Sequence, residues 1–344
     1  MRLNRGKQRY PCLKHIKELK RRREIARRRK HGSIYSLKNR NRLHKGIVVK
    51  DKIVAPVDLR FIQNPSETLV FFNSLRNRNN ISEYNKRRYI EISLYKVEKI
   101  DFATISILKS IFGEYSHLGV AIRGNYPKHV DCRKKMEESG FFKGMTDNRG
   151  GDILTLNPVG TYHKFEKAGG KLIDEHFEKI EKVSEEAYSH LYNSEGYFDE
   201  LETILKEIAG NAVEWGRAYN REWQIGFFKS EGKVTITVTD LGKGIIDSLF
   251  ISEKLKVIDF LFLRSKLDVL NRAFERKYGS FTQEPNRNRG LPMIKNFSDE
   301  KFLKNLYVCS NEAFIDFEKR SNSRLLNTNF ERFNGTFYQW ELSL

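Results

Sequence analysis

The chain has 344 residues, of which 39% are hydrophobic, and a formal net charge of +19, which suggests about two domains with enough apolar material for two buried cores. Its three cysteines, Cys12, Cys132 and Cys309, lie far apart in the sequence, which argues against a disulfide scaffold and a structural zinc site and fits a reducing, cytoplasmic setting. No run of about 18 apolar residues is present, so no membrane span is expected, and the highly charged N-terminus argues against a secretory signal.

Residues 1–45 are the most basic part of the chain. The first 50 residues hold 19 Lys and Arg against two acidic residues, a net charge of +17, so the other 294 residues carry only +2. A run such as KELKRRREIARRRKHG repels itself and can bury little apolar surface. We expect a disordered or partly helical basic arm. It is either merely solvated or binds a polyanion, such as nucleic acid, the ribosome or anionic lipid, with a steep dependence on salt.

Residues 46–145 alternate between strand and helix patterns. The β-branched runs in GIVVKDKIVAP, the period of two in Ile90, Ile92 and Leu94, and the short run VAIRGN predict strands. Helices are expected in NPSETLVFFNSLRN, with Pro65 in the first turn, in FATISILKSIFGEYSHLG up to Gly119, and in HVDCRKKMEESGFF up to Gly140. Strands that alternate with helices of this length predict an α/β fold with a mixed or parallel sheet covered by helices.

The stretch YIEISLYKVEKIDFATISILKSIFGEYSHLGVAIRGNYPKHVDCRKKMEESGFF resembles a STAS domain, the fold of anti-sigma factor antagonists. The similar features are the strand that ends in Ile100-Asp101, the helix directly after it, the strand GVAIRGN, and a last helix that ends in Gly-Phe-Phe. The resemblance implies a STAS-like domain over residues 46–145 that can contact a protein partner.

The chain departs from this family at the phosphoacceptor. In the antagonists the aspartate is followed by two serines, and the second serine accepts a phosphate. Here Asp101 is followed by Phe102, and the acceptor position falls on Ala103, which has no hydroxyl group. We expect the next residue, Thr104, to be an ordinary first-turn threonine with a solvated or backbone-bonded hydroxyl group.

Residues 146–197 are expected to be a linker and a connecting helix. The Gly- and Asn-rich stretch TDNRGGDILTLNPVGTYHKF predicts a linker or a hairpin. The apolar spacing of Leu172, Ile173, Phe177 and Ile180 then predicts a charged helix with one apolar stripe. The stripe favours packing within the chain, and a short helical homodimer stays open as an alternative.

Residues 198–344 contain the strongest site signals. In FDELETILKEIAGNAVEWG the apolar residues have helix periodicity, and Glu207 and Asn211, one turn apart, share a face beside that stripe. Alone, such a pair can be a surface contact worth roughly a few tenths of a kcal/mol. Two strands, EWQIGFFKS and KVTITVTD, follow around a Glu-Gly turn and bring Asp240 into DLGKGI. An aspartate at a strand end can accept a hydrogen bond from a ligand amine, and glycines let the backbone approach a flat ligand.

This order of motifs resembles the GHKL ATPases, which have the Bergerat fold, and it is nearest to the anti-sigma serine kinases. The N-box is EIAGNAVEWG, the next box is DLGKGI, the glycine box NRGLPMIKNF has Gly290 opening a helix, and the closing strand NGTFYQWELSL contains Gly335-Thr336. The resemblance implies a Bergerat-fold α/β sandwich over residues 198–344 that binds ATP and Mg²⁺.

The resemblance also implies roles for the metal, the nucleophile and the adenine. Asn211 would coordinate Mg²⁺, a hard cation that accepts a carboxamide oxygen. Glu207 would orient or deprotonate the attacking water or hydroxyl group. Asp240 would accept the adenine amino hydrogen, with help from Thr336.

The remaining motif residues would surround the ligand. Gly242 and Gly244 would pass under the adenine. Gly290 and Leu291 would offer backbone N–H groups to a phosphate at the helix N-terminus. Residues 264–289 would form a mobile lid, in which Arg289 could pair with phosphate oxygens.

Three features depart from the family pattern. Pro292 stands where a second glycine is usual, which removes one N–H donor and puts fast turnover in doubt. Gly210 stands where Asp or Thr often precedes the asparagine. None of His163, His176 and His190 is followed by the acidic residue and the proline that mark a histidine-kinase phosphoacceptor, so a two-component role is disfavoured.

The sequence therefore supports three functional hypotheses. In the first, a GHKL domain is an ATP-dependent switch that acts on the STAS-like module, with slow hydrolysis or phosphotransfer. In the second, the chain is a non-catalytic nucleic-acid- or protein-binding module, and ATP only stabilises its fold. In the third, the chain is a serine/threonine kinase that acts on a separate antagonist.

Overall fold

The structure is a computed structural model that describes residues 47–48, 50–84, 86–147, 150–153, 158–166, 172–215, 222–251, 265–275, 290–326 and 331–344. The basic arm of residues 1–45 lies outside the described residues. Contacts divide the chain into two compact units, residues 1–49 with 83–86, and residues 50–82 with 87–344. In the first unit, β1 (Ile47–Val48) pairs antiparallel with Glu83 and Tyr84 of β4 (Ser82–Tyr84). The other described elements belong to the second unit.

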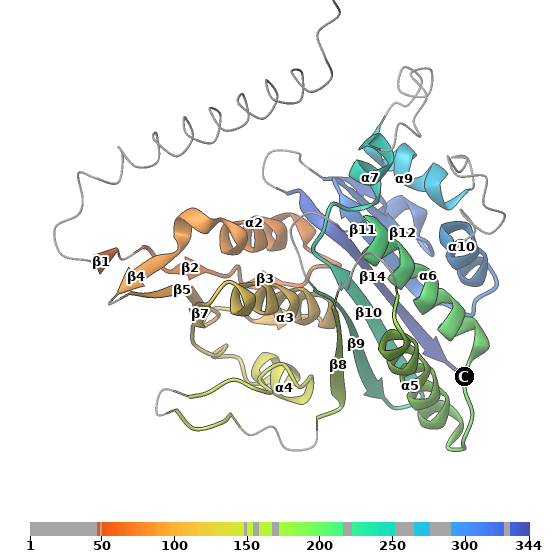
Figure 1. Ribbon diagram of the computed structural model, residues 1–344, viewed down its shortest axis with the longest axis horizontal. Helices are drawn as coiled ribbons and strands as arrows, with labels where there is room; N and C mark the ends of the chain where they lie inside the picture. The colour runs from red at the N-terminus through yellow and green to blue at the C-terminus, as the bar shows by residue number, and fades with distance from the viewer. Residues whose placement is uncertain are drawn as a thin grey trace, which may run out of the picture. The chain divides into compact units, whose positions relative to one another are not determined.

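Seven antiparallel strands form the main sheet of the second unit (Figure 1). In order across the sheet they are β13 (Arg324–Leu325), β12 (Ala313–Asp316), β11 (Lys304–Asn311), β14 (Phe333–Ser343), β10 (Lys233–Asp240), β9 (Glu222–Ser230) and β8 (Gly160–Glu166). The predicted Glu231-Gly232 turn joins β9 to β10, and Gly232 has the positive φ of +64° that tight hairpin turns need. Strand β8 comes from residues that the sequence suggested to be a linker.

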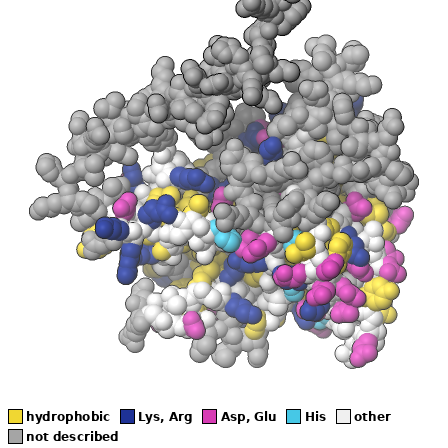
Figure 2. Space-filling model, viewed as in Figure 1, with side chains coloured by type: hydrophobic (Ala, Val, Ile, Leu, Met, Phe, Trp, Pro, Cys, Tyr) yellow, Lys and Arg dark blue, Asp and Glu magenta, His cyan; other side chains and the backbone are white. Residues whose placement is uncertain are grey.

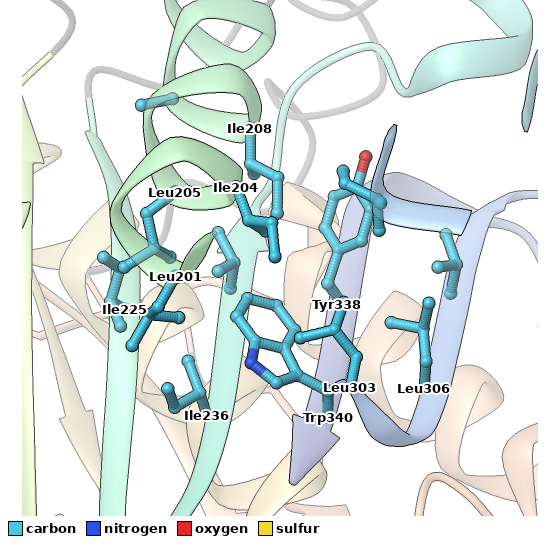
Figure 3. Close-up of a cluster of buried hydrophobic side chains, with 14 of the residues drawn as sticks. Leu201, Ile204, Leu205, Ile208, Ile225, Ile236, Leu303, Leu306, Tyr338 and Trp340 are labelled. Carbon is cyan, nitrogen blue, oxygen red and sulfur yellow. The ribbon is translucent and has the colours of Figure 1, made fainter. Parts of the chain in front are cut away.

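Helices pack on one face of this sheet and enclose a first core (Figures 1 and 3). The helices of this part of the chain are α5 (Asp174–Tyr192), α6 (Asp199–Trp215), α7 (Ile245–Ile251), α9 (Lys266–Phe274) and α10 (Gly290–Asp299). Figure 3 shows Ile204 and Ile208 of α6 lying over Tyr338 and Trp340 of β14. The apolar stripe that the sequence shows in α6 is thus the face that it buries.

The opposite face of the sheet is also covered, by the N-terminal elements, and encloses a second core. Strand β10 alternates apolar residues toward the first core with threonines on the other face, and Thr235, Thr237 and Thr239 are all buried. The Ser106 hydroxyl group, in helix α3 (Phe102–His117), lies 2.7 Å from the Thr237 hydroxyl group. A Cβ on Gly226 of β9 would lie 2.8 Å from the same Ser106 oxygen, so α3 approaches the sheet closely at a glycine.

The N-terminal elements have the predicted alternation of strands and helices. They are β2 (Ile53–Val54), β3 (Asp58–Leu59), α2 (Pro65–Arg76), the 3₁₀ turn η1 (Arg78–Asn80), β5 (Arg87–Ser93), β6 (Lys99–Ile100), α3, β7 (Val120–Arg123) and α4 (Val130–Glu138). Strand β5 pairs in parallel with β2 and β7, and β3 pairs in parallel with β6. Pro65 opens α2, and Gly119 and Gly140, both at positive φ, follow the ends of α3 and α4. The α/β class expected from the sequence is confirmed.

The surface over α5 and α6 is acidic (Figure 2). Helix α5 alone contributes Asp174, Glu175, Glu178, Glu181, Glu185 and Glu186. Such a surface repels polyanions, so any attraction for nucleic acid has to come from another part of the chain. All helices within the described residues are too short or too polar to span a bilayer.

Candidate functional site

Asp240 and Thr336 lie side by side at one end of the sheet. Asp240 ends β10 and is directly opposite Thr336 of β14 in the antiparallel register. Both share the face of Val238, which packs in the first core beneath α6, because alternate strand residues point to the same side. Both are only 7% exposed, and the Thr336 hydroxyl group lies 3.3 Å from that of Ser310. Burial, with a smaller contribution from the charge of Asp240, raises the pKa of Tyr338 above its usual range.

Two glycines pack around the loop that follows Asp240. Gly244 has a φ of +83°, and a Cβ there would lie 2.6 Å from the Gly335 carbonyl oxygen and still closer to Asn311 Oδ1. Gly335 has a φ of +143°, and a Cβ there would lie 3.0 Å from the Asp240 carbonyl carbon. Both positions therefore require glycine. Gly242 is buried within the same loop.

Asn311 and Ser310 fix this loop and the start of α7. Asn311 donates from Nδ2 to the Lys243 carbonyl oxygen at 2.7 Å, and its Oδ1 accepts from the Ile246 N–H at 3.1 Å. The Ser310 hydroxyl oxygen accepts from the Ile245 N–H at 2.8 Å. Sequence reasoning missed both residues. The available signal was a Ser-Asn pair at the end of an apolar strand, where asparagine tolerates the left-handed φ of +54° that Asn311 adopts.

Glu207 of α6 contacts the first residue of α10. A Cβ on Gly290 would lie 3.1 Å from Glu207 Cβ and closer still to Glu207 Oε2, so this carboxylate lies against the Gly290 backbone. Glu207 is half-buried, and burial raises its pKa above that of an ordinary glutamate. Asn211, one turn later, is also half-buried, and a Cβ on the adjacent Gly210 would meet open space. The structure thus brings together Glu207 and Gly290, which the sequence placed in separate motifs.

The sequence predicted a helix from Gly290, and Gly290, the first residue described after residue 275, lies in helix α10 (Gly290–Asp299). Leu291 is half-buried against the first core, and Pro292 is buried in the first turn, where a missing N–H is tolerated. Arg289 lies outside the described residues, as does most of the expected lid. Within residues 264–289 the structure describes residues 265–275, which include α9.

Thr104 is enclosed by backbone hydrogen bonds. Its hydroxyl group donates to the Leu59 carbonyl oxygen at 2.6 Å and accepts from the Phe61 N–H at 3.0 Å, and the residue has no exposed surface. Asp101 caps the same helix by accepting from the Thr104 N–H at 2.8 Å, and burial raises the pKa of this carboxyl group. The expectation of a backbone-bonded threonine is confirmed, and this hydroxyl group is inaccessible to a phosphoryl donor.

No family model matches the chain, and no curated protein sequence matches it. Among solved structures, the chain is similar to a mycobacterial sensor histidine kinase, MprB, with 15% sequence identity and a TM-score of 0.25, over 53% of this chain and 97% of that one. A TM-score this low does not establish a shared fold. The assignment of the site therefore depends on its own residues.

Proposed function

We propose that this chain is an ATP- and Mg²⁺-binding regulatory protein of the GHKL type. In this proposal residues 198–344 are a nucleotide-dependent switch that acts on the STAS-like residues 46–145. The supporting observation is the cross-strand pair of Asp240 and Thr336, buried on the helix side of the sheet beside a glycine loop. A carboxylate and a hydroxyl group in this arrangement can bond the edge of a flat ring, while glycine backbone lies against its face, which suits adenine.

The residues around α6 and α10 suit a magnesium triphosphate. Proteins often hold Mg²⁺ through one or two side chains together with substrate phosphates. Asn211 would provide its carboxamide oxygen, and the bound ion would neutralise phosphate charge. Gly290 and Leu291 would donate their N–H groups to a phosphate, and Arg289 could reach one from the lid.

Glu207 is the candidate general base. Its raised pKa suits a group that takes a proton from an attacking water or hydroxyl group. Proton transfer by such a group contributes about 10²–10⁴-fold to a rate.

Calorimetry and steady-state turnover with Mg-ATP test this proposal. We expect wild type to bind Mg-ATP and turn it over slowly, and Glu207→Ala to bind with similar affinity and lose turnover. Glu200→Ala removes an exposed carboxylate from the same helix and serves as the matched control. The absence of binding at millimolar Mg-ATP in the wild type would refute the proposal.

Two observations favour the second candidate, a non-catalytic module that ATP stabilises. Pro292 lacks one N–H donor in the first turn of α10, and the first turn of α3 offers no accessible hydroxyl group as an acceptor, because Ala103 has none and that of Thr104 is buried and bonded to the backbone. Equal, near-zero turnover of wild type and Glu207→Ala, with intact binding, would support this candidate. A serine/threonine kinase activity would need a separate antagonist as substrate, and phosphate transfer to such a protein from labelled ATP would reveal it.

Binding of a polyanion by residues 1–45 is an independent proposal. Its support is the charge of this arm alone. The affinity of the chain for a DNA or RNA duplex, measured with and without the arm at two salt concentrations, tests it. An unchanged affinity after deletion would refute it.

A further inference from the structure

Arg76, the last residue of α2, contacts both backbone segments that carry the Asp240–Thr336 pair. Its Nη1 donates to the Asn334 carbonyl oxygen at 2.8 Å, and its Nη2 donates to the Leu241 carbonyl oxygen at 3.1 Å. Leu241 directly follows Asp240, and Asn334 lies two residues before Thr336. One guanidinium group from the N-terminal elements therefore spans the two strands at the candidate adenine site.

Glu114 of α3 orients this guanidinium group. Arg76 Nε lies 3.2 Å from Glu114 Oε2, and the two side chains are only 16% and 14% exposed. A guanidinium group presents its donors in a rigid, planar fork, so an ion pair at Nε leaves the two terminal nitrogens aimed at the two carbonyl oxygens. Arg76 thus connects α2 and α3 with the loop after Asp240 and with the start of β14.

Two more side chains on the same face of α2 contact the segment that enters β14. Asn73 donates from Nδ2 to the Arg332 carbonyl oxygen at 3.0 Å, and the Ser66 hydroxyl group donates to Glu331 Oε2 at 3.0 Å. Positions 66, 73 and 76 share one face of the helix because they are spaced by seven and three residues. The polar face of α2 is therefore a support for residues 331–334.

Arg332, in the same segment of residues 331–334, also contacts α7. The Arg332 guanidinium group pairs with Glu312 Oε1 at 2.5 Å and with the carboxylate of Asp247 in α7. The Glu312 side chain is only 4% exposed, whereas that of Arg332 is 30% exposed, so the pair anchors a partly exposed guanidinium group to a buried carboxylate. Contacts run without a break from α2, through residues 331–334, to the helix that follows the glycine loop.

We propose that Arg76 is a positioning residue for the nucleotide site, and that this contact couples nucleotide binding to the STAS-like elements. The inference rests on the proposed function, because it names the residue through which the switch is transmitted. Without Arg76, the carbonyl groups of Leu241 and Asn334 lose their common donor, and the loop after Asp240 and the segment before Thr336 are no longer tied to α2 at the end of the β10–β14 ladder. Nucleotide binding would in turn favour the arrangement of α2 and α3 in which Arg76 donates to both carbonyl oxygens, since coupling between two sites is reciprocal.

The test compares wild type with Arg76→Lys and Arg76→Ala. Lysine keeps the charge but cannot present separate donors to Glu114, Leu241 and Asn334 at once. Arg78→Ala is the matched control, because it removes an exposed arginine two residues later. Two measurements are made on the full chain, the Kd for Mg-ATP by calorimetry and the hydrogen exchange of residues 241–244 and 333–337 without ligand.

We expect Arg76→Ala to weaken Mg-ATP binding about tenfold, the equivalent of one lost charged hydrogen bond. Arg76→Lys should weaken it nearly as much, and Arg78→Ala should leave it unchanged. Exchange should rise in residues 241–244 and 333–337 of both Arg76 variants and stay constant in β9, which separates positioning from general loosening of the fold.

Two results would overturn the inference. If the Arg76 variants bind Mg-ATP like the wild type, the coupling is absent although the proposed function stands. If the wild type binds no Mg-ATP, the proposed function fails and the inference fails with it. The wild-type titration therefore distinguishes these two failures.

Discussion

Replacing Gly244 with alanine tests the tight packing of the loop after Asp240. The φ of +83° costs an L-residue about 1–2 kcal/mol. The new Cβ would also lie 2.6 Å from the Gly335 carbonyl oxygen and closer to Asn311 Oδ1, and relief of such overlap typically costs about 1–3 kcal/mol. The two contributions together predict a loss of about 2–5 kcal/mol in the free energy of unfolding.

Gly232→Ala is the control that separates the two contributions. Gly232 also has a positive φ, +64°, but a Cβ there would meet no atom within 4 Å. Its replacement should therefore cost only the conformational part, about 1–2 kcal/mol. Urea unfolding, followed by the fluorescence of the buried Trp223 and Trp340, measures both variants.

The difference between the two variants is the decisive quantity. If Gly244→Ala and Gly232→Ala shift the urea midpoint equally, the close contact of Gly244 with Gly335 and Asn311 does not exist in solution. Mg-ATP affinity gives a second readout, because Gly244→Ala should weaken binding while Gly232→Ala, at the far end of the β9–β10 hairpin, should not.

Four further predictions concern single side chains. Asp240→Asn should weaken Mg-ATP binding about tenfold or more by calorimetry, since it removes a charged acceptor, and an unchanged Kd would exclude Asp240 from the adenine site. Burial raises the pKa of Glu207, so turnover should fall as the pH drops through a value above the ordinary 4.5, and Glu207→Gln should abolish turnover at every pH. Burial, and to a smaller extent the charge of Lys179, lowers the pKa of His176 below 6.5. The folded state therefore binds fewer protons than the unfolded state, and the free energy of unfolding should decrease as the pH falls below about 6.5. His176→Phe should flatten this part of the curve of stability against pH, and an identical curve in the variant would contradict the lowered pKa of His176. Thr104→Val leaves the Leu59 carbonyl oxygen and the Phe61 N–H without their hydroxyl partner. The free energy of unfolding, measured by thermal or urea unfolding, should fall by about 1–3 kcal/mol for each group, and an unchanged value would disprove these two buried hydrogen bonds.

Local chemistry made several elements predictable from the sequence. Proline at the first helical position predicted the start of α2, and the run FATISILKSIFGEYSHLG predicted α3 directly after Asp101, which the structure shows to cap that helix. Helix periodicity predicted the buried stripe of α6, and the Glu-Gly turn predicted the β9–β10 hairpin. A helix was also expected at Gly290, which lies in α10. In each case the signal lies within a few residues of the feature.

The parts that the sequence did not reveal depend on contacts between distant residues. Asp240 and Thr336 are 96 positions apart, and the sequence paired them only through the family resemblance, because their local sequence does not show that the register of β10 and β14 places them together. Arg76 looks like any arginine in the last turn of a helix, where cations are favoured by the helix dipole. Its carbonyl partners have no sequence signal at all, because every residue has a carbonyl group. Ser310 and Asn311 were missed for the same reason, since their partners are backbone groups about 65 residues away.

The burial of β9 and β10 on both faces gives the switch hypothesis a physical basis. Residues 223–228 of β9 are all buried, as in a strand that is covered on both sides. In β10, Val238 packs toward α6 while Thr237, one residue away, contacts Ser106 of α3. A displacement of Asp240 on nucleotide binding would therefore move a strand to which α3 is hydrogen-bonded. Because close-packed layers do not deform continuously, such a movement has to be shared by α3 or resisted by it, and either response couples the two faces.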